Sequence, residues 1–168
     1  MIPSDHFVRF YNEVFKFLDA QGGLQAYYEE ISRHQELHCL KEFREKGLQG
    51  VYEYYQKIYK EENCQGEVIL HGHELCLNME KCPSLSKALN NDAGACAKYC
   101  LHCPGWTGPL YKKAGLFQVY SLMGLDNPQC CEWIYDDKKL ASAKYFELKE
   151  KTPEDQLFIN FDPETGSL

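Results

Sequence analysis

Sulfur and imidazole side chains gather in the middle of the sequence. Cys96, Cys100 and Cys103 follow one another four and three residues apart, and His102 stands next to the last of them. Cysteines spaced by about one helical turn place their sulfurs on one side, where a tetrahedral metal needs them. This spacing indicates zinc, an iron–sulfur cluster, or a group of free thiols at the end of a helix.

A metal site of this kind needs a fourth ligand. Cys82, Cys130, Cys131 and His102 are the candidates. Cys82 has a second interpretation, because it precedes a proline where a short helix is expected to begin. Backbone N–H groups at a helix start can lower a thiol pKa. With His102 as its base, Cys82 would then be a catalytic nucleophile that needs no metal.

Secondary candidates lie on the expected strands on either side of this cluster. His71 and His73 are two residues apart, and alternate residues of a strand face the same side. They could share a metal or make separate hydrogen bonds. Cys131 is a further candidate beside Cys130, but adjacent strand residues point to opposite faces, so only one of the two can enter a given site.

Four carboxylates lie near these segments and are candidates for acid–base chemistry: Glu74, Asp92, Asp126 and Glu132. A carboxyl group becomes useful for proton transfer near neutral pH when burial or a partner shifts its pKa. The sequence alone does not show which of them is buried.

The elements that must position these groups change character near residue 64. Before it, apolar residues recur at helical spacing and predict helices within residues 5–60. After it, short alternating runs predict strands, with Gly72 as a bulge or bend. We expect strands at 66–79 and 116–135, a hairpin turn at 126–129, short helices at 83–89, 93–101 and 107–113, and a strand with a helical end at 140–151.

These patterns predict a single α+β domain with a helical N-terminal half and a small antiparallel sheet packed with short helices. The chain has 168 residues, a length that suits one domain. We divide it into a helical lead-in, a cysteine-rich core of sheet and helices, and a C-terminal extension, at residues 1–63, 64–137 and 138–168.

Composition excludes several classes of protein. Apolar residues make up 44% of the chain and aromatic residues 14%, which excludes a disordered chain. The net charge is −7 with scattered basic residues, which argues against nucleic-acid and anionic-membrane partners. Nine cysteines, an odd number without a visible signal peptide, lead us to expect free thiols, no disulfides and a cytoplasmic protein. The sequence leaves a homo-oligomer open.

Three segments resemble a known family. They are Lys81-Cys82-Pro83, the run from Tyr99 to Cys103, and the strand Cys131-Glu132-Trp133-Ile134. Together they look like the L-2-amino-thiazoline-4-carboxylic acid hydrolase-like proteins and, more distantly, the 4-vinyl-reductase-type ligand-binding domains. The likeness spans roughly residues 20–137. It departs from the family at 104–106, where members often carry an acidic residue, and at 127–129, where they often have Gly-Asp.

The resemblance implies a small-molecule hydrolase whose pocket lies between sheet and helices. Cys82, Cys100, His102 and Cys103 would line it. Zinc-bound water is one mechanism and a free cysteine activated by His102 is the other. The alternative function is a sensor or carrier without catalysis that holds a metal, an iron–sulfur cluster or a small ligand in the same pocket.

Overall fold

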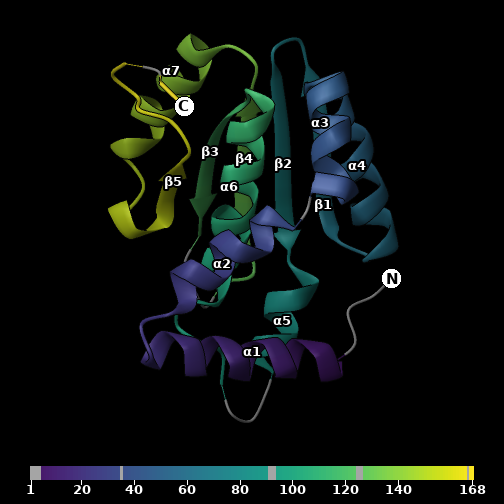
Figure 1. Cartoon of the computed structure of the whole chain (residues 1–168), viewed down its shortest axis with the longest axis vertical. Coiled ribbons are helices and arrows are strands. Elements are labelled where there is room, and N and C mark those ends of the chain that lie inside the picture. The colour runs from purple at the N-terminus through teal and green to yellow at the C-terminus, as the bar shows by residue number, and fades with distance from the viewer. Residues whose placement is uncertain (1–4, 35, 91–93, 124–126, 166) are drawn as a thin grey trace.

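The computed structural model describes residues 5–34, 36–90, 94–123, 127–165 and 167–168. A five-stranded antiparallel sheet carries helices on both faces, which confirms the predicted α+β class (Figure 1). The strand order is β1-β2-β4-β3-β5. The strands are β1 (Gln65–His71), β2 (Glu74–Lys81), β3 (Phe117–Leu122), β4 (Cys130–Tyr135) and β5 (Leu157–Ile159).

Helices fill most of the N-terminal third and also separate the strands. A π-helical turn at Glu36–Leu40 precedes α3, and 3₁₀ turns occupy Tyr99–Leu101 and Glu154–Gln156. The α-helices are α1 (Asp5–Ala20), α2 (Leu24–Arg33), α3 (Lys41–Lys46), α4 (Leu48–Glu61), α5 (Pro83–Leu89), α6 (His102–Ala114) and α7 (Lys138–Lys149).

The helices form two layers with the sheet between them. On one face, α3, α4 and α6 bury Phe43, Val51 and Leu110 against Leu75 and Ile134 of the sheet. On the other face, α7 packs Ala141 against Val119 and Tyr135, among other residues of β3 and β4. Alternation along the strands therefore decides which layer each side chain meets.

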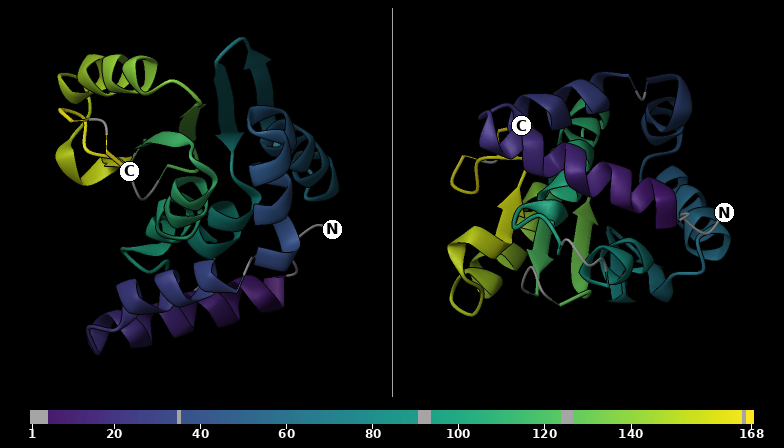
Figure 2. Two further views of the ribbon diagram at one scale, coloured as in Figure 1. Left: turned by 45° about the horizontal axis from the view of Figure 1, so that its top comes forward. Right: turned by 90° about the horizontal axis from the view of Figure 1, so that it is seen from below.

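Helix α1 crosses one end of the molecule, next to α2 and α5 (Figures 1 and 2). Helical spacing in its sequence predicts one buried stripe of Phe7, Phe10, Val14, Phe15 and Leu18, but the inward face of α1 is a different one. Val8, Asn12 and Phe15 are buried, whereas Phe7 and Phe10 are each 61% exposed. The apolar spacing identified the helix but misplaced its buried side, because a polar residue holds the centre of that side.

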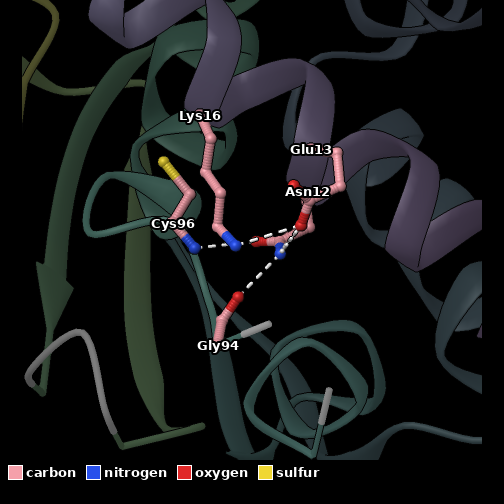
Figure 3. Close-up of polar contacts among 5 residues, drawn as sticks. All are labelled: Asn12, Glu13, Lys16, Gly94 and Cys96. Carbon is pink, nitrogen blue, oxygen red and sulfur yellow. Dashed lines mark hydrogen bonds and ion pairs between the residues drawn. The ribbon is translucent and has the colours of Figure 1, made fainter. Parts of the chain in front are cut away.

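That residue is Asn12, whose side chain is fully buried. Its amide nitrogen donates to the carbonyl oxygen of Gly94 at 2.8 Å, and its Oδ1 accepts from the backbone nitrogen of Cys96 at 2.7 Å (Figure 3). The Nδ2 group also lies 3.1 Å from Glu13, which pairs with Lys16 at 3.0 Å. Asn12 thus binds α1 to the segment that leads into the cysteine-rich centre.

Two predictions in the second half of the chain are wrong. We expected a helix over 93–101 to stop at Cys103-Pro104-Gly105, but α6 begins at His102 and continues through these residues. Pro104 lies in the first turn, where a backbone N–H is not needed, so it does not stop the helix. Residues 140–151 contain no strand: α7 starts after Asp137, whose side chain accepts from the nitrogen of Lys139 at 2.7 Å.

The predicted strands at 66–79 and 116–135 are confirmed as two antiparallel hairpins. Asp126, in the predicted turn at 126–129, lies outside the described residues, as does Asp92. Residues 138–168, predicted to be an extension, supply α7 and β5, and β5 pairs with β3. Within the described ranges, every helix is too short or too polar to cross a bilayer.

Replacing Asn12 by Ala should lower the free energy of unfolding by about 2–4 kcal/mol, because it leaves a buried N–H and a buried C=O without partners. Urea denaturation measures the change. Glu13→Ala is the control, since it removes only an exposed neighbour and should cost less than about 0.5 kcal/mol. Equal losses in the two variants would show that Asn12 does not anchor α1.

Candidate functional site

A cavity of about 460 Å³ lies between the helices and the inner face of the sheet. Helices α1, α2, α4 and α6 and strands β2, β3 and β4 all contribute to its wall. Phe7 and Tyr11 of α1 belong to this wall and are also 61% and 44% exposed to solvent, which places the mouth of the cavity beside α1. Aromatic rings dominate the rest of the wall, among them Phe15, Tyr54, Tyr55, Tyr59, Trp106 and Tyr120.

Four thiols from distant parts of the sequence border this cavity. They are Cys64 just before β1, Cys82 before α5, Cys103 in the first turn of α6 and Cys130 at the start of β4. The hydroxyl of Tyr120 lies 3.2 Å from the Cys130 sulfur and also interacts with the Cys103 thiol. Burial raises the pKa of Cys103 to about 12 and raises that of Cys130 as well, so both are neutral thiols at pH 7.

His102 and Cys103 form an oriented pair in the cavity wall. The Nδ1 atom of His102 lies 2.5 Å from the carbonyl oxygen of Tyr99, which can only accept, so Nδ1 carries the proton. The Nε2 atom therefore presents a lone pair, and it lies 3.4 Å from the Cys103 sulfur. Burial lowers the pKa of His102, which keeps the ring neutral at pH 7.

Cys82 occupies the helix start that its sequence predicts, but its thiol is not activated there. It caps α5, and its sulfur accepts from the backbone nitrogen of Leu85 at 3.4 Å. Burial outweighs this hydrogen bond and raises the pKa of Cys82 to about 11. The expectation of a lowered pKa at this position is therefore wrong, because the site is withdrawn from water.

Glu132 is the buried carboxyl group of the site, only 4% exposed. Its Oε1 accepts a hydrogen bond from Gln118 and lies 3.4 Å from the Thr107 hydroxyl. Burial raises the pKa of Glu132 to about 7, although these two donors lower it in part. A Cβ atom at Gly108 would lie 3.0 Å from Oε1 of Gln118, so a larger residue there would displace the amide that bonds Glu132.

The structure does not bring the other predicted metal ligands to this cavity. Cys96 is buried in a separate core cluster with Val8 and Leu85, and Cys100 packs against the same cluster. Across the described residues, no group of three or more Cys, His, Asp or Glu side chains could hold a metal ion. The expectation of zinc or an iron–sulfur cluster at Cys82, Cys96, Cys100 and Cys103 therefore stays a prediction that this geometry does not support.

The secondary candidates also lie elsewhere. His71 ends β1 and His73 belongs to the turn, because the chain reverses at Gly72, which has a φ of 58°. The idea that both imidazoles face one side of a strand is wrong: both are exposed, and His73 contacts Asp136 at 2.8 Å. Cys131 points to the face opposite Cys130, as strand alternation predicts.

No motif or spacing in the sequence identifies several residues of the cavity wall. Tyr120 and Thr107 belong to an apolar strand and a helix, and their roles depend on neighbours far away in sequence. The sequence pattern of Tyr54, Tyr55 and Tyr59 is typical of a core face with a polar rim, yet these residues border the cavity. Strand alternation could have found part of the site, because Cys130 and Glu132 share a face with Tyr120 through the β3–β4 register.

Comparison of the chain with protein families, curated proteins and solved structures gave no match. The resemblance to hydrolase-like proteins therefore stays a hypothesis carried by its three short segments. The function has to be argued from the cavity itself.

Glu132→Gln should remove a pH dependence of stability. A carboxyl group with a raised pKa binds its proton more tightly in the folded state than in the unfolded state. Its contribution to the stability of the fold is therefore complete below pH 4.5 and is lost as the pH rises through about 7. The loss amounts to about 3 kcal/mol for a shift of this size. Urea unfolding of both proteins between pH 5 and 8 measures this loss. As the pH rises, the free energy of unfolding of the wild type should fall relative to that of the variant.

Glu67→Gln is the matched control, because Glu67 is an exposed glutamate on the edge strand β1 of the same sheet. It should leave the pH profile of wild-type stability unchanged. Parallel profiles for wild-type and Glu132→Gln protein would contradict a raised pKa at Glu132.

Proposed function

We propose that the protein is a thiol-dependent, hydrolase-type enzyme that acts on a small uncharged aromatic molecule, with Cys103 as nucleophile and His102 as its base. The observation that supports this is the oriented pair, in which the free lone pair of His102 lies 3.4 Å from the Cys103 sulfur at the edge of a cavity. A nucleophile, a base and a group that orients the base are the parts such chemistry needs. Cys103 replaces Cys82 as the nucleophile, because the imidazole contacts Cys103.

The composition of the wall defines the class of molecule. No lysine or arginine among the described residues borders the cavity, so it offers no partner to an anionic ligand. The aromatic rings favour a flat apolar molecule. Trp106 borders the cavity, and its buried indole N–H has no acceptor within the described chain. An unpaired buried donor is costly, so a ligand with a carbonyl or similar acceptor would be favoured.

The proposed reaction moves one proton from Cys103 to His102 and then from His102 to the leaving group. The Cys103 sulfur attacks an electrophilic carbon of the substrate while its proton passes to Nε2 of His102. The leaving group takes that proton, and water then releases the second product from the thioester, which restores the thiol. Glu132 adds a carboxyl group in the same wall that can give or take a proton near neutral pH, since burial raises its pKa to about 7.

The test uses 4-nitrophenyl acetate, a small uncharged aromatic ester. We expect a rapid release of nitrophenolate and an acetyl group on Cys103, found by mass spectrometry of proteolytic peptides. Cys103→Ser and His102→Gln should each lower the rate of this step by about 100-fold or more. Circular dichroism checks that the variants keep the helical content of the wild type.

Matched controls separate this site from general thiol reactivity. Cys100→Ser alters a half-buried cysteine three residues away that does not border the cavity, and it should react like the wild type. His73→Ala removes an exposed imidazole outside the site and should also have no effect. Acetylation spread over other cysteines, or an unchanged rate in His102→Gln, would overturn the proposal.

Ligand binding without reaction is the second candidate function. Burial raises the pKa of Cys82, Cys103 and Cys130, so none of the three is a thiolate at neutral pH. A carrier or sensor needs only the aromatic cavity. Saturable binding of the neutral fluorophore N-phenyl-1-naphthylamine, unchanged in Cys103→Ser and without acetylation in the ester test, would favour this function over catalysis.

A further inference from the structure

A second pair of thiols lies on the opposite face of the sheet from the cavity. Cys76 of β2 and Cys131 of β4 belong to neighbouring strands, and their sulfur atoms are 3.6 Å apart. The register pairs Cys76 with Trp133 and Asn78 with Cys131. The two cysteines are therefore diagonal neighbours on one face, a relation in which side chains can reach each other.

The pair is separate from the cavity because strand residues alternate between faces. Leu77 and Met79 of β2 and Cys130 and Glu132 of β4 border the cavity. Cys76 directly precedes Leu77, and Cys131 lies between Cys130 and Glu132, so both point the other way, toward the side that α7 partly covers. Cys131 is buried, whereas Cys76 is only partly buried and can be reached by a small reagent.

The surroundings make the two sulfurs chemically unequal. A hydrogen bond from Cys131 lowers the pKa of Cys76, and the ammonium group of Lys144 in α7 acts in the same direction, while burial and Glu74 oppose them. Lys144 is held nearby, 5.2 Å from the centre of the Trp133 ring. The pKa of Cys131 is raised by its hydrogen bond to Cys76. The lower pKa makes Cys76 the better nucleophile of the two sulfurs.

We propose that Cys76 and Cys131 form a redox-active dithiol site that reacts with low-molecular-weight disulfides such as oxidised glutathione and closes reversibly to an internal disulfide. The sulfurs have to approach from 3.6 Å to about 2.05 Å. Cys76 and Cys131 form no disulfide in the structure, so it represents the reduced form of the pair.

The exchange balances in two steps. The Cys76 thiolate attacks one sulfur of oxidised glutathione, which forms a mixed disulfide and releases one glutathione thiolate. That thiolate takes the proton of Cys131, whose sulfur then attacks Cys76 and releases the second glutathione. In total the protein gives up two electrons and two protons, one released to solvent when Cys76 ionises and one passed from Cys131 to the first glutathione. The second glutathione leaves as a thiolate and takes a proton from solvent, so the disulfide ends as two glutathione thiols. Attack by Cys131 follows the loss of negative charge at Cys76, which removes the repulsion between the two sulfurs.

The test equilibrates the wild-type protein in glutathione buffers of increasing oxidised fraction, followed by acid quenching, alkylation of free thiols and peptide mapping. We expect a loss of two hydrogens per chain and a cross-linked pair of peptides, one containing Cys76 and the other Cys131. Excess dithiothreitol should reverse it. This measurement needs no variant, so a mutant that fails to fold would leave the test intact.

Variants then assign the roles of the two sulfurs. Cys131→Ser should trap glutathione on Cys76, and Cys76→Ser should neither cross-link nor take up glutathione at Cys131 at a comparable rate. Cys100→Ser is the control and should form the cross-link as the wild type does. A protein that gains only glutathione adducts in oxidising buffer, or that cross-links among Cys82, Cys103 and Cys130 instead, would overturn the proposal. The ester test of Cys103 is unaffected by either outcome.

Discussion

The hydrogen bonding of Glu132 constrains the centre of this molecule. A carboxyl group buried on β4 is costly unless hydrogen bonds meet it. Gln118 of β3 donates to it, and the Thr107 hydroxyl of α6 lies 3.4 Å away. The Thr107 hydroxyl also lies 2.8 Å from the carbonyl oxygen of Cys103, one turn earlier in α6. The network that satisfies Glu132 therefore also fixes the turn that carries the His102–Cys103 pair against the sheet.

Alternation along β4 then divides the chemistry of the protein between two faces. Cys130 and Glu132 meet the cavity, while Cys131 and the neighbouring Trp133 meet the layer that contains α7. A shift of register by one residue would exchange these sets and place a tryptophan in the cavity. Pairing of β4 with both β2 and β3 over its full length opposes such a shift, so the position of each thiol follows from its place in the strand.

The fold could largely be predicted from periodicity, whereas the site could be predicted only in part. Helical spacing before residue 64 and alternation after it were sufficient for α1–α4 and for the two hairpins. Pro104 was misleading, because whether a proline ends a helix or lies in its first turn depends on where the helix begins. The grouping of Cys82, His102 and Cys103 around one cavity was expected from resemblance, but the exclusion of Cys96 and Cys100 depends on the backbone direction at the start of α6, which spacing does not contain.

Burial keeps the acid–base groups around the cavity largely uncharged. Cys103 and His102 are both neutral, and Glu132 is close to half-protonated at neutral pH, because burial disfavours charge in each case. A charged ligand would pay the same desolvation cost in this cavity unless a counter-ion met it. No lysine or arginine among the described residues borders the cavity to supply one. A carboxylate substrate, which the name of the resembled family suggests, is therefore a poorer match for this cavity than a neutral aromatic compound whose reaction moves a proton from sulfur to imidazole.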